Sequence, residues 1–248
     1  MSERNRLRSL LTLVWLNGVV PIRDQPLYIL NLLASPLSFL FFITIVSRGA
    51  LIAYGITGGM VLTMLSVGTS LQSDLTHYRV DLRFQDTVVA SPVEAPVYVG
   101  GMALSEFVYS LPGLAVFVLL FVLAHFANLY TLAVLTGVLI LVWAFASALA
   151  FTLATYFRDV RETFLFSPLI SLALTVLPPV YYPISALPGW AQFAAKFSPT
   201  TYAASLVQGA VGLAPLSELG AGIDWGVLIG FTAVLFLIAA VKARWKEP

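Results

Sequence analysis

Apolar stretches long enough to cross a lipid bilayer recur along the chain, and they constrain its fold more than any other feature. A bilayer core needs about 20 helical residues to span it. Only 10% of the side chains are charged, against roughly 25% in soluble domains, so the chain lacks the polar surface of a soluble protein. We therefore predict an all-α membrane protein with six transmembrane helices, at 27–47, 49–71, 100–124, 129–157, 164–182 and 225–241.

Proline, asparagine and glycine residues shape the first two predicted spans. Asn31 and Pro36 predict a kink in the first span, because proline removes a helical hydrogen bond. Only Arg48 separates the two spans, so we expect a tight helical hairpin. The second span contains glycines that allow close contact between helix backbones, namely Gly55, Gly58, Gly59 and Gly68.

The distribution of basic residues predicts the orientation in the membrane. With both termini in the cytoplasm, 11 of the 13 Lys and Arg residues lie on the inner side, and only Arg48 and Lys196 lie outside. Membrane proteins keep an excess of positive charge on the cytoplasmic side. We therefore predict a multi-pass protein of the inner or plasma membrane with both termini cytoplasmic. The scattered basic residues and the net charge of +1 argue against a nucleic-acid partner.

Residues 1–26 are expected to form a cytoplasmic amphipathic helix at the membrane interface. Arg4, Arg6 and Arg8 accompany leucines at helical spacing, and Pro21 breaks the pattern. Interfacial helices of this kind place their basic residues against anionic lipid headgroups. The apolar run is interrupted and no cleavage site of small residues follows it, which disfavours a secretory signal peptide.

The longest charged interval inside the chain is the loop at 72–99, between the second and third spans. Leu75, Tyr78 and Leu82 recur at helical spacing, and Ser73 is placed to cap a helix. We expect a short amphipathic helix in the cytoplasm, a coupling helix that passes force from a soluble partner into the membrane domain. The alternative is a solvated loop that only joins two spans.

The interval at 183–223, between the fifth and sixth spans, is poor in charge for an external loop. It contains only Lys196 and Glu218 as charged residues. Pro188-Gly189 opens one short helical pattern, and Ser198-Pro199 opens another with a capping serine and a proline in the first turn. We predict two re-entrant helices folded back into the outer end of the bundle. A small external cap resting on the membrane is the alternative.

The signatures of the common enzyme classes are missing from the chain. It has no G-x-x-x-x-G-K-[ST] phosphate loop, so ATP hydrolysis by that route is not expected here. It has no cysteine, which excludes disulfides and thiolate sites. The only histidines, His77 and His125, fall on opposite sides of the predicted membrane, which excludes a metal site built from both. We predict no catalytic residue, metal or cofactor in this chain.

Glu106 is the most notable ionisable residue inside a predicted span. An acid within a membrane helix is a candidate functional group, here a polar contact at the inner end of a translocation path. At about 1.5 Å per residue it lies roughly 9 Å into its helix. The alternative is therefore a carboxylate that reaches the cytoplasmic interface or pairs with an arginine of the inner loops.

Several short motifs, in this order and spacing, resemble the permease subunit of a type-2 ABC exporter. The resemblance covers about residues 72 to 210, together with the layout of an amphipathic amino terminus, six spans and a folded-back region. The motifs are Ala90-Ser91-Pro92-Val93 before Gly100, Arg158-Asp159-Val160-Arg161, Pro178-Pro179-Val180, Leu187-Pro188-Gly189 and Ser198-Pro199-Thr200.

The resemblance implies partners and contact residues. Two permease subunits, identical or different, would form the export pathway, and two separate ABC ATPase subunits would bind ATP and Mg²⁺. Many drug exporters carry Arg-Glu-x-Gly-Thr in the coupling helix, whereas this chain differs over Tyr78–Asp86, so its contact chemistry differs. The residues implied in coupling to the ATPase are Asp74, Tyr78, Arg79, Asp81, Leu82, Arg83, Phe84, Asp86, Arg158, Asp159 and Arg161.

These features predict an export permease with a drug-like, lipid-linked or polysaccharide cargo. The main alternative is an ATP-independent membrane scaffold or assembly factor that uses the loop at 72–99 as a docking site. An intramembrane enzyme ranks third, because its nucleophile, base and metal constellations are missing.

Overall fold

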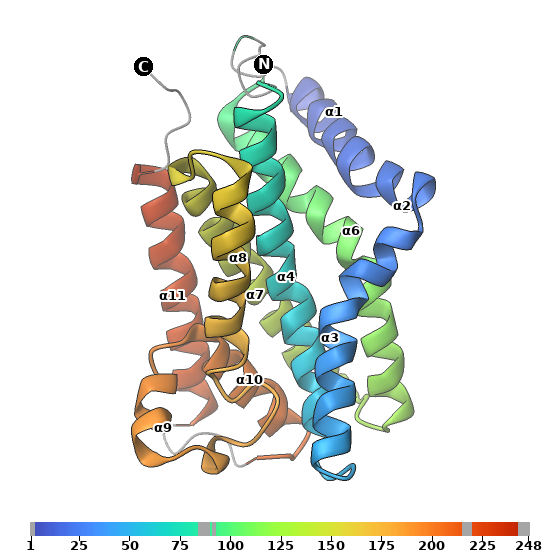
Figure 1. Cartoon of the computed structure of the whole chain (residues 1–248), viewed down its shortest axis with the longest axis vertical. Coiled ribbons are helices and arrows are strands. Elements are labelled where there is room, and N and C mark those ends of the chain that lie inside the picture. The colour runs from blue at the N-terminus through green and yellow to red at the C-terminus, as the bar shows by residue number, and fades with distance from the viewer. Residues whose placement is uncertain (1–2, 84–89, 91–92, 215–219, 243–248) are drawn as a thin grey trace.

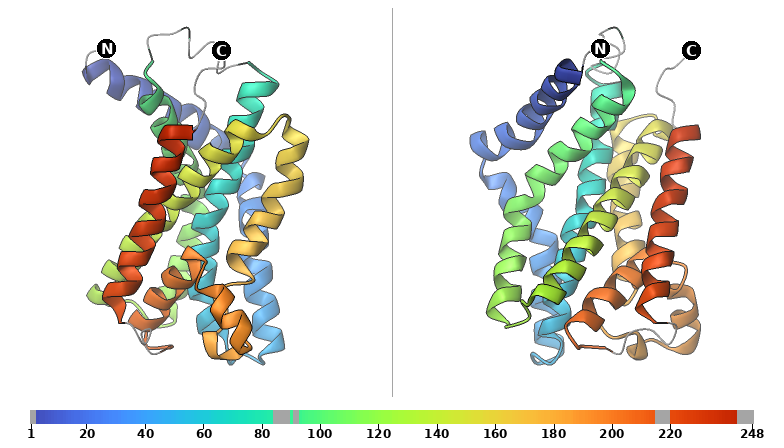
Figure 2. Two further views of the ribbon diagram at one scale, coloured as in Figure 1. Left: turned by 90° about the vertical axis from the view of Figure 1, so that its left-hand side faces the viewer. Right: turned by 180° about the vertical axis from the view of Figure 1, so that it is seen from behind.

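The computed structural model describes residues 3–83, 90, 93–214 and 220–242, and all elements within these ranges are helical. The long helices run side by side as one bundle (Figures 1 and 2). They are α3 (Leu27–Val46), α4 (Ile52–Val80), α6 (Ala95–Leu123), α7 (Leu129–Tyr156), α8 (Val160–Thr175) and α11 (Ala221–Lys242). The prediction of an all-α protein is confirmed.

Four of these helices are long and apolar enough to cross a membrane: α4, α6, α7 and α11. The stretch of α3 at 32–46 is apolar but shorter. α8 has 16 residues and ends at Thr175, before the predicted end of its span at 182. Pro178 and Pro179 follow closely, and proline cannot supply the backbone N–H that would continue a helix.

α4 is the central helix of the bundle. It packs against α3, α6, α7, α8 and α10, and it is buried along most of its length. Two of its glycines allow this close packing. A Cβ on Gly59 would lie 2.0 Å from the ring of Phe117, and one on Gly68 would lie 2.7 Å from the carbonyl oxygen of Ala146.

The amino-terminal segment packs across α6 at the upper end of the bundle in Figure 1. It consists of α1 (Glu3–Val14), a π-helical turn η1 (Trp15–Val19) and α2 (Val20–Asp24). Gly18 approaches α6 so closely that a Cβ would lie 2.8 Å from the carbonyl oxygen of Ser105. The hydroxyl of Ser105 donates a hydrogen bond to the carbonyl of Leu13, at 3.0 Å. The sequence pattern predicted that Pro21 ends the helical segment. In the structure it lies in the first turn of α2, and the helical segment continues through Asp24.

The opposite, lower end of the bundle holds the short helices η2 (Ile184–Ala186), α9 (Gly189–Ala195) and α10 (Pro199–Ala210). α10 packs against α4, α7 and α11, and the Gln208 amide donates to the carbonyls of Pro179 and Val180 at 3.0 and 3.2 Å. Ser198 stands at the N-cap position of α10, but its side chain makes no capping bond and pairs with the Thr200 hydroxyl at 2.7 Å. The predicted serine cap is therefore wrong, although the helix begins where expected.

The first part of the region predicted as a separate coupling helix is a continuation of α4. α4 continues without a break through Val80, nine residues beyond the predicted end of the second span. Ser73 does not cap a helix: it lies inside α4, and its hydroxyl donates to the carbonyl of Thr69 at 3.1 Å. Gln72 is buried rather than solvated. The part of the predicted helix at 84–89 lies outside the described residues.

Candidate functional site

A polar stripe on α4 is the starting point of the candidate site. Each of Ser66, Thr69, Ser70, Ser73 and Asp74 lies three or four residues from another member of the set, which places them on one face of the helix. Three of the hydroxyls donate to carbonyls of α4 itself, at distances between 2.7 and 3.1 Å. Each hydroxyl proton is therefore used within the helix, and the oxygen lone pairs remain available as acceptors.

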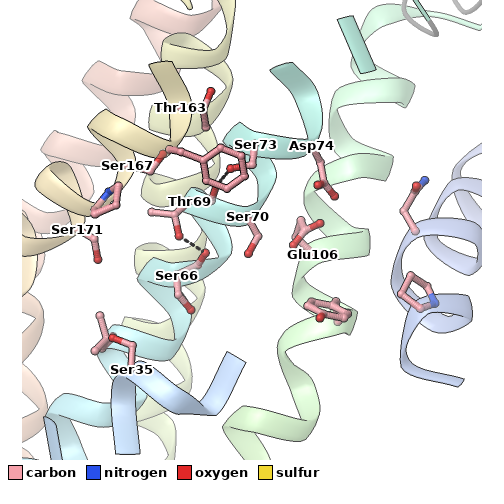
Figure 3. Close-up of a pocket in the computed structure, with 16 residues that line it drawn as sticks. Ser35, Ser66, Thr69, Ser70, Ser73, Asp74, Glu106, Thr163, Ser167 and Ser171 are labelled. Atoms are coloured by element: carbon pink, nitrogen blue, oxygen red, sulfur yellow. Dashed lines mark hydrogen bonds between the residues drawn. The ribbon is translucent and has the colours of Figure 1, made fainter. Parts of the chain in front are cut away.

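The stripe faces a cavity of about 730 Å³ in the side of the bundle, which is open to the outside. α3, α6, α8 and the η1–α2 segment supply the other walls (Figure 3). Most of the polar lining consists of hydroxyl groups, and none of the described residues that line the cavity is Lys, Arg or His. A concave site between helices with several polar groups is a typical place for a small molecule to bind, and ionisable groups within a membrane bundle are candidate functional groups.

Two carboxyl groups meet at one wall of the cavity. Asp74 on α4 and Glu106 on α6 point toward each other (Figure 3) and lie within side-chain hydrogen-bonding range. A hydrogen bond between two carboxyl groups needs a proton on one of them. Glu106 is only 3% exposed, so it does not extend to the membrane interface, and its partner is an acid rather than an arginine. The interpretation of Glu106 as an interfacial carboxylate is therefore wrong.

Two buried hydroxyls on α8 complete the opposite wall. Thr163 is fully buried and Ser167 is 7% exposed, and both line the cavity. Neither hydroxyl oxygen has a hydrogen-bond partner among the described residues. A buried polar group without a partner costs free energy, about 1–3 kcal/mol. Both oxygens are themselves buried, so each hydroxyl would need to rotate about its χ1 angle to bond to a molecule in the cavity.

The amino-terminal segment contributes one wall and attaches to α4. Asn17 lines the cavity, and its side-chain oxygen accepts a hydrogen bond from the Tyr78 hydroxyl at 2.7 Å. The Asn17 amide donates to the carbonyl of Leu13 at 3.2 Å. Tyr78, which the resemblance implied in contacts with an ATPase, thus binds within its own chain and connects α4 to η1.

Arg79 also makes contacts within the chain at the upper end. Its guanidinium donates to the carbonyl of Thr155 at 2.6 Å and to that of Phe157. These carbonyls end α7, where helix carbonyls lack partners and the helix dipole favours a cation. Arg79 therefore joins the end of α4 to the turn between α7 and α8.

The remaining coupling residues at the end of α4 are placed as follows. Asp81 pairs with His77 at 2.8 Å, one helical turn apart. Leu82 and Arg83 follow the last turn of α4 and are exposed. Phe84 and Asp86 lie outside the described residues. Whether these residues contact an ATPase stays a prediction.

The start of α8 carries the remaining three coupling residues. Asp159 is at the N-cap position, with Arg158 before it and Arg161 in the first turn. The Asp159 carboxylate accepts from the Glu162 backbone N–H at 2.8 Å, and the Glu162 carboxylate accepts from the Arg158 N–H at 2.8 Å. This reciprocal pair is a helix-capping arrangement. Arg158 and Arg161 are exposed beside it, on the turn that Arg79 binds. The structure therefore brings the two predicted contact segments together at one end of the bundle.

Comparison with known families adds the decisive observation. The family model described as ABC-2 type transporter matches residues 8–211, most of the chain and nearly all of the helices described above. The chain belongs to the ABC-2 type transporter family. No curated protein sequence matches it. The chain is thus an ABC-2 type permease, a multi-pass membrane subunit that works with an ABC ATPase in a lipid bilayer.

Membership in this family confirms the resemblance found in the short motifs. An ABC-2 type permease is a transport subunit, which agrees with the lack of enzyme motifs in its sequence. Sequence reasoning missed the cavity, because it assigned Asp74 to a solvated loop. The signal was present: between Ser66 and Ser73, each serine and threonine has another one three or four residues away, and Asp74 follows directly.

Proposed function

We propose that this permease forms one half of a dimeric export pathway, and that a separate ABC ATPase drives it by pushing on the upper end of the bundle. The cargo class is drug-like, lipid-linked or polysaccharide. The observation that carries the proposal is the hydroxyl-lined cavity on α4, in the body of a chain of the ABC-2 type transporter family.

The geometry of α4 supports a mechanical link between the upper end and the cavity. From Ser66 on the cavity wall to Val80, α4 is one continuous helix, a distance of about 21 Å at 1.5 Å per residue. An uninterrupted helix transmits displacement along its axis. Arg79 ties the last turn of α4 to the turn between α7 and α8, so a force applied there acts on α4 and α8 together.

The arrangement of the chain supports a membrane topology with six spans and both ends on the cytoplasmic side. α1 begins and α11 ends at the upper end, together with the end of α4 and the start of α8 (Figures 1 and 2). α3 and α8 would then cross as shorter helices, completed by the segments that flank them. The family assignment favours this transporter over an ATP-independent scaffold.

The test uses an exposed leucine at the upper end. Leu82 is 58% exposed directly after α4, where an apolar contact with a partner is possible. In proteoliposomes that contain the permease and its ABC ATPase, we expect Leu82→Asp to abolish stimulation of ATP hydrolysis while the permease still folds. Leu129→Asp is the matched control, because Leu129 is 88% exposed at the lower end. Unchanged stimulation with Leu82→Asp would contradict the proposed coupling.

A further inference from the structure

The carboxyl pair of the cavity lacks a basic partner in its surroundings. No Lys, Arg or His is among the described residues that line the cavity. His77 lies three residues from Asp74 on α4 and interacts with it electrostatically, but it is bound to Asp81 at 2.8 Å. The Tyr78 phenol lies near both carboxyl groups and is neutral. Among the described residues that line the cavity, the pair therefore has no basic side chain opposite it.

A hydrogen bond between Asp74 and Glu106 needs at least one proton on the pair. A cation in the cavity would favour the form with a single negative charge on the two groups, because an opposite charge nearby stabilises an ionised carboxyl group. A charge that is buried without a counterion is strongly unfavourable. A ligand with one positive charge would offset this cost. A protonated amine suits the position best among organic cations, because its N–H groups can donate to both carboxyl groups at once.

The rest of the cavity indicates what else the ligand carries. The acceptor oxygens of Ser66 and Thr69 call for hydroxyl or amide groups on the ligand. The buried hydroxyls of Thr163 and Ser167 would join them after a rotation about χ1. Phe164 adds an aromatic surface to the same wall. The volume of about 730 Å³ lies within the range of roughly 300–1,000 Å³ that small-molecule sites occupy.

We propose that the cavity binds a small amphipathic cargo with a protonated amine, and that Asp74 and Glu106 together hold its ammonium group. The inference rests on the proposed function only in calling the ligand a cargo. It narrows the broad cargo classes given above to amine-bearing small molecules with hydrogen-bonding groups.

The first test needs no variant and no ATPase. The permease in lipid nanodiscs is titrated with monodansylcadaverine, a fluorescent aromatic primary amine, and with its uncharged N-acetyl derivative. Nanodiscs without protein give the lipid background for each probe. We expect the amine to bind at least tenfold more tightly than the acetylated probe. Equal binding of the two probes would overturn the proposal.

The second test assigns the preference to the carboxyl pair. The double variant Asp74→Asn/Glu106→Gln keeps the side-chain shapes and removes the charge. Asp24→Asn is the control, because Asp24 is an exposed acid at the end of α2 that does not line the cavity. We expect the double variant to bind both probes equally and the control to keep the preference. A preference that persists in the folded double variant would overturn the assignment. If the double variant does not fold, the comparison of the two probes on the unmodified chain still decides whether the cavity prefers an amine.

These tests are separable from the test of the proposed function. Coupling to the ATPase is measured at Leu82, which lies outside the cavity. A permease that stimulates its ATPase but shows no preference for the amine would keep the proposed function and lose only the cargo assignment.

Discussion

Replacing Arg79 tests whether its guanidinium holds the end of α4 to the end of α7. The resemblance to known exporters implied a contact with the ATPase, whereas the structure uses the guanidinium to bind the carbonyls of Thr155 and Phe157 at the end of α7. Arg79→Met removes the guanidinium and keeps an apolar stem of similar length. Arg161→Met is the matched control, because Arg161 is exposed in the first turn of α8.

The size of the effect follows from the two bonds that are lost. A hydrogen bond to a charged group contributes about 1.5–3 kcal/mol. Arg79 is half-buried, and water can replace part of each bond, so the lower end of that range applies. We expect Arg79→Met to lower the free energy of unfolding by about 2–3 kcal/mol. The control should change it by less than about 0.5 kcal/mol, as for most exposed positions.

Steric trapping in nanodiscs measures this free energy for a membrane protein. Arg79→Lys should recover only part of the loss, because an ammonium lacks the planar fork that reaches two carbonyls. The reasoning would be refuted if Arg79→Met unfolded with the same free energy as the control. In that case, a loss of ATPase stimulation by Arg79→Met would point back to a direct contact with the partner.

Two further predictions concern packing and pH. A Cβ on Gly68 would lie 2.7 Å from the carbonyl oxygen of Ala146, so Gly68→Ala should destabilise the bundle by about 1–3 kcal/mol. A Cβ on Gly230 has open space around it, so Gly230→Ala should stabilise α11 by up to about 1 kcal/mol. Equal changes in the free energy of unfolding of the two variants would contradict this account. Arg6 holds the pKa of the Glu94 carboxyl below its usual value through a hydrogen bond at 2.7 Å, so the tether from α1 to the start of α6 should persist above about pH 4.3 and weaken as the pH falls through the lowered pKa. The protection of the α1 amides, which is their exchange relative to the intrinsic rate at each pH, should therefore fall at low pH. In Glu94→Gln this protection should be low already at neutral pH, and a variant that matched the unmodified chain at neutral pH would refute the tether.

The sequence was informative wherever a local pattern sufficed. The apolar runs predicted most of the long helices, and the short motifs led to the right family. Helix ends were less predictable. α4 continues through Val80, because its polar residues have partners on α6, α7 and η1, and these lie far away in the sequence.

The candidate site was likewise only partly predictable from the sequence. Glu106 stood out in the sequence as an acid inside a span, but its partner did not, because Asp74 reads as a loop residue until α4 is known to continue past it. The signal for the cavity was the spacing of hydroxyls along α4, which by itself describes any polar helix face.

The sequence alone determined that the chain is helical, apolar and suited to a membrane, because hydrophobicity and helical spacing depend on neighbouring residues. Only the tertiary structure decided that Arg79 binds the end of α7 and that Asp74 meets Glu106 across a cavity from two unpartnered hydroxyls. These contacts join residues on different helices, and their existence depends on how the helices pack rather than on any one segment.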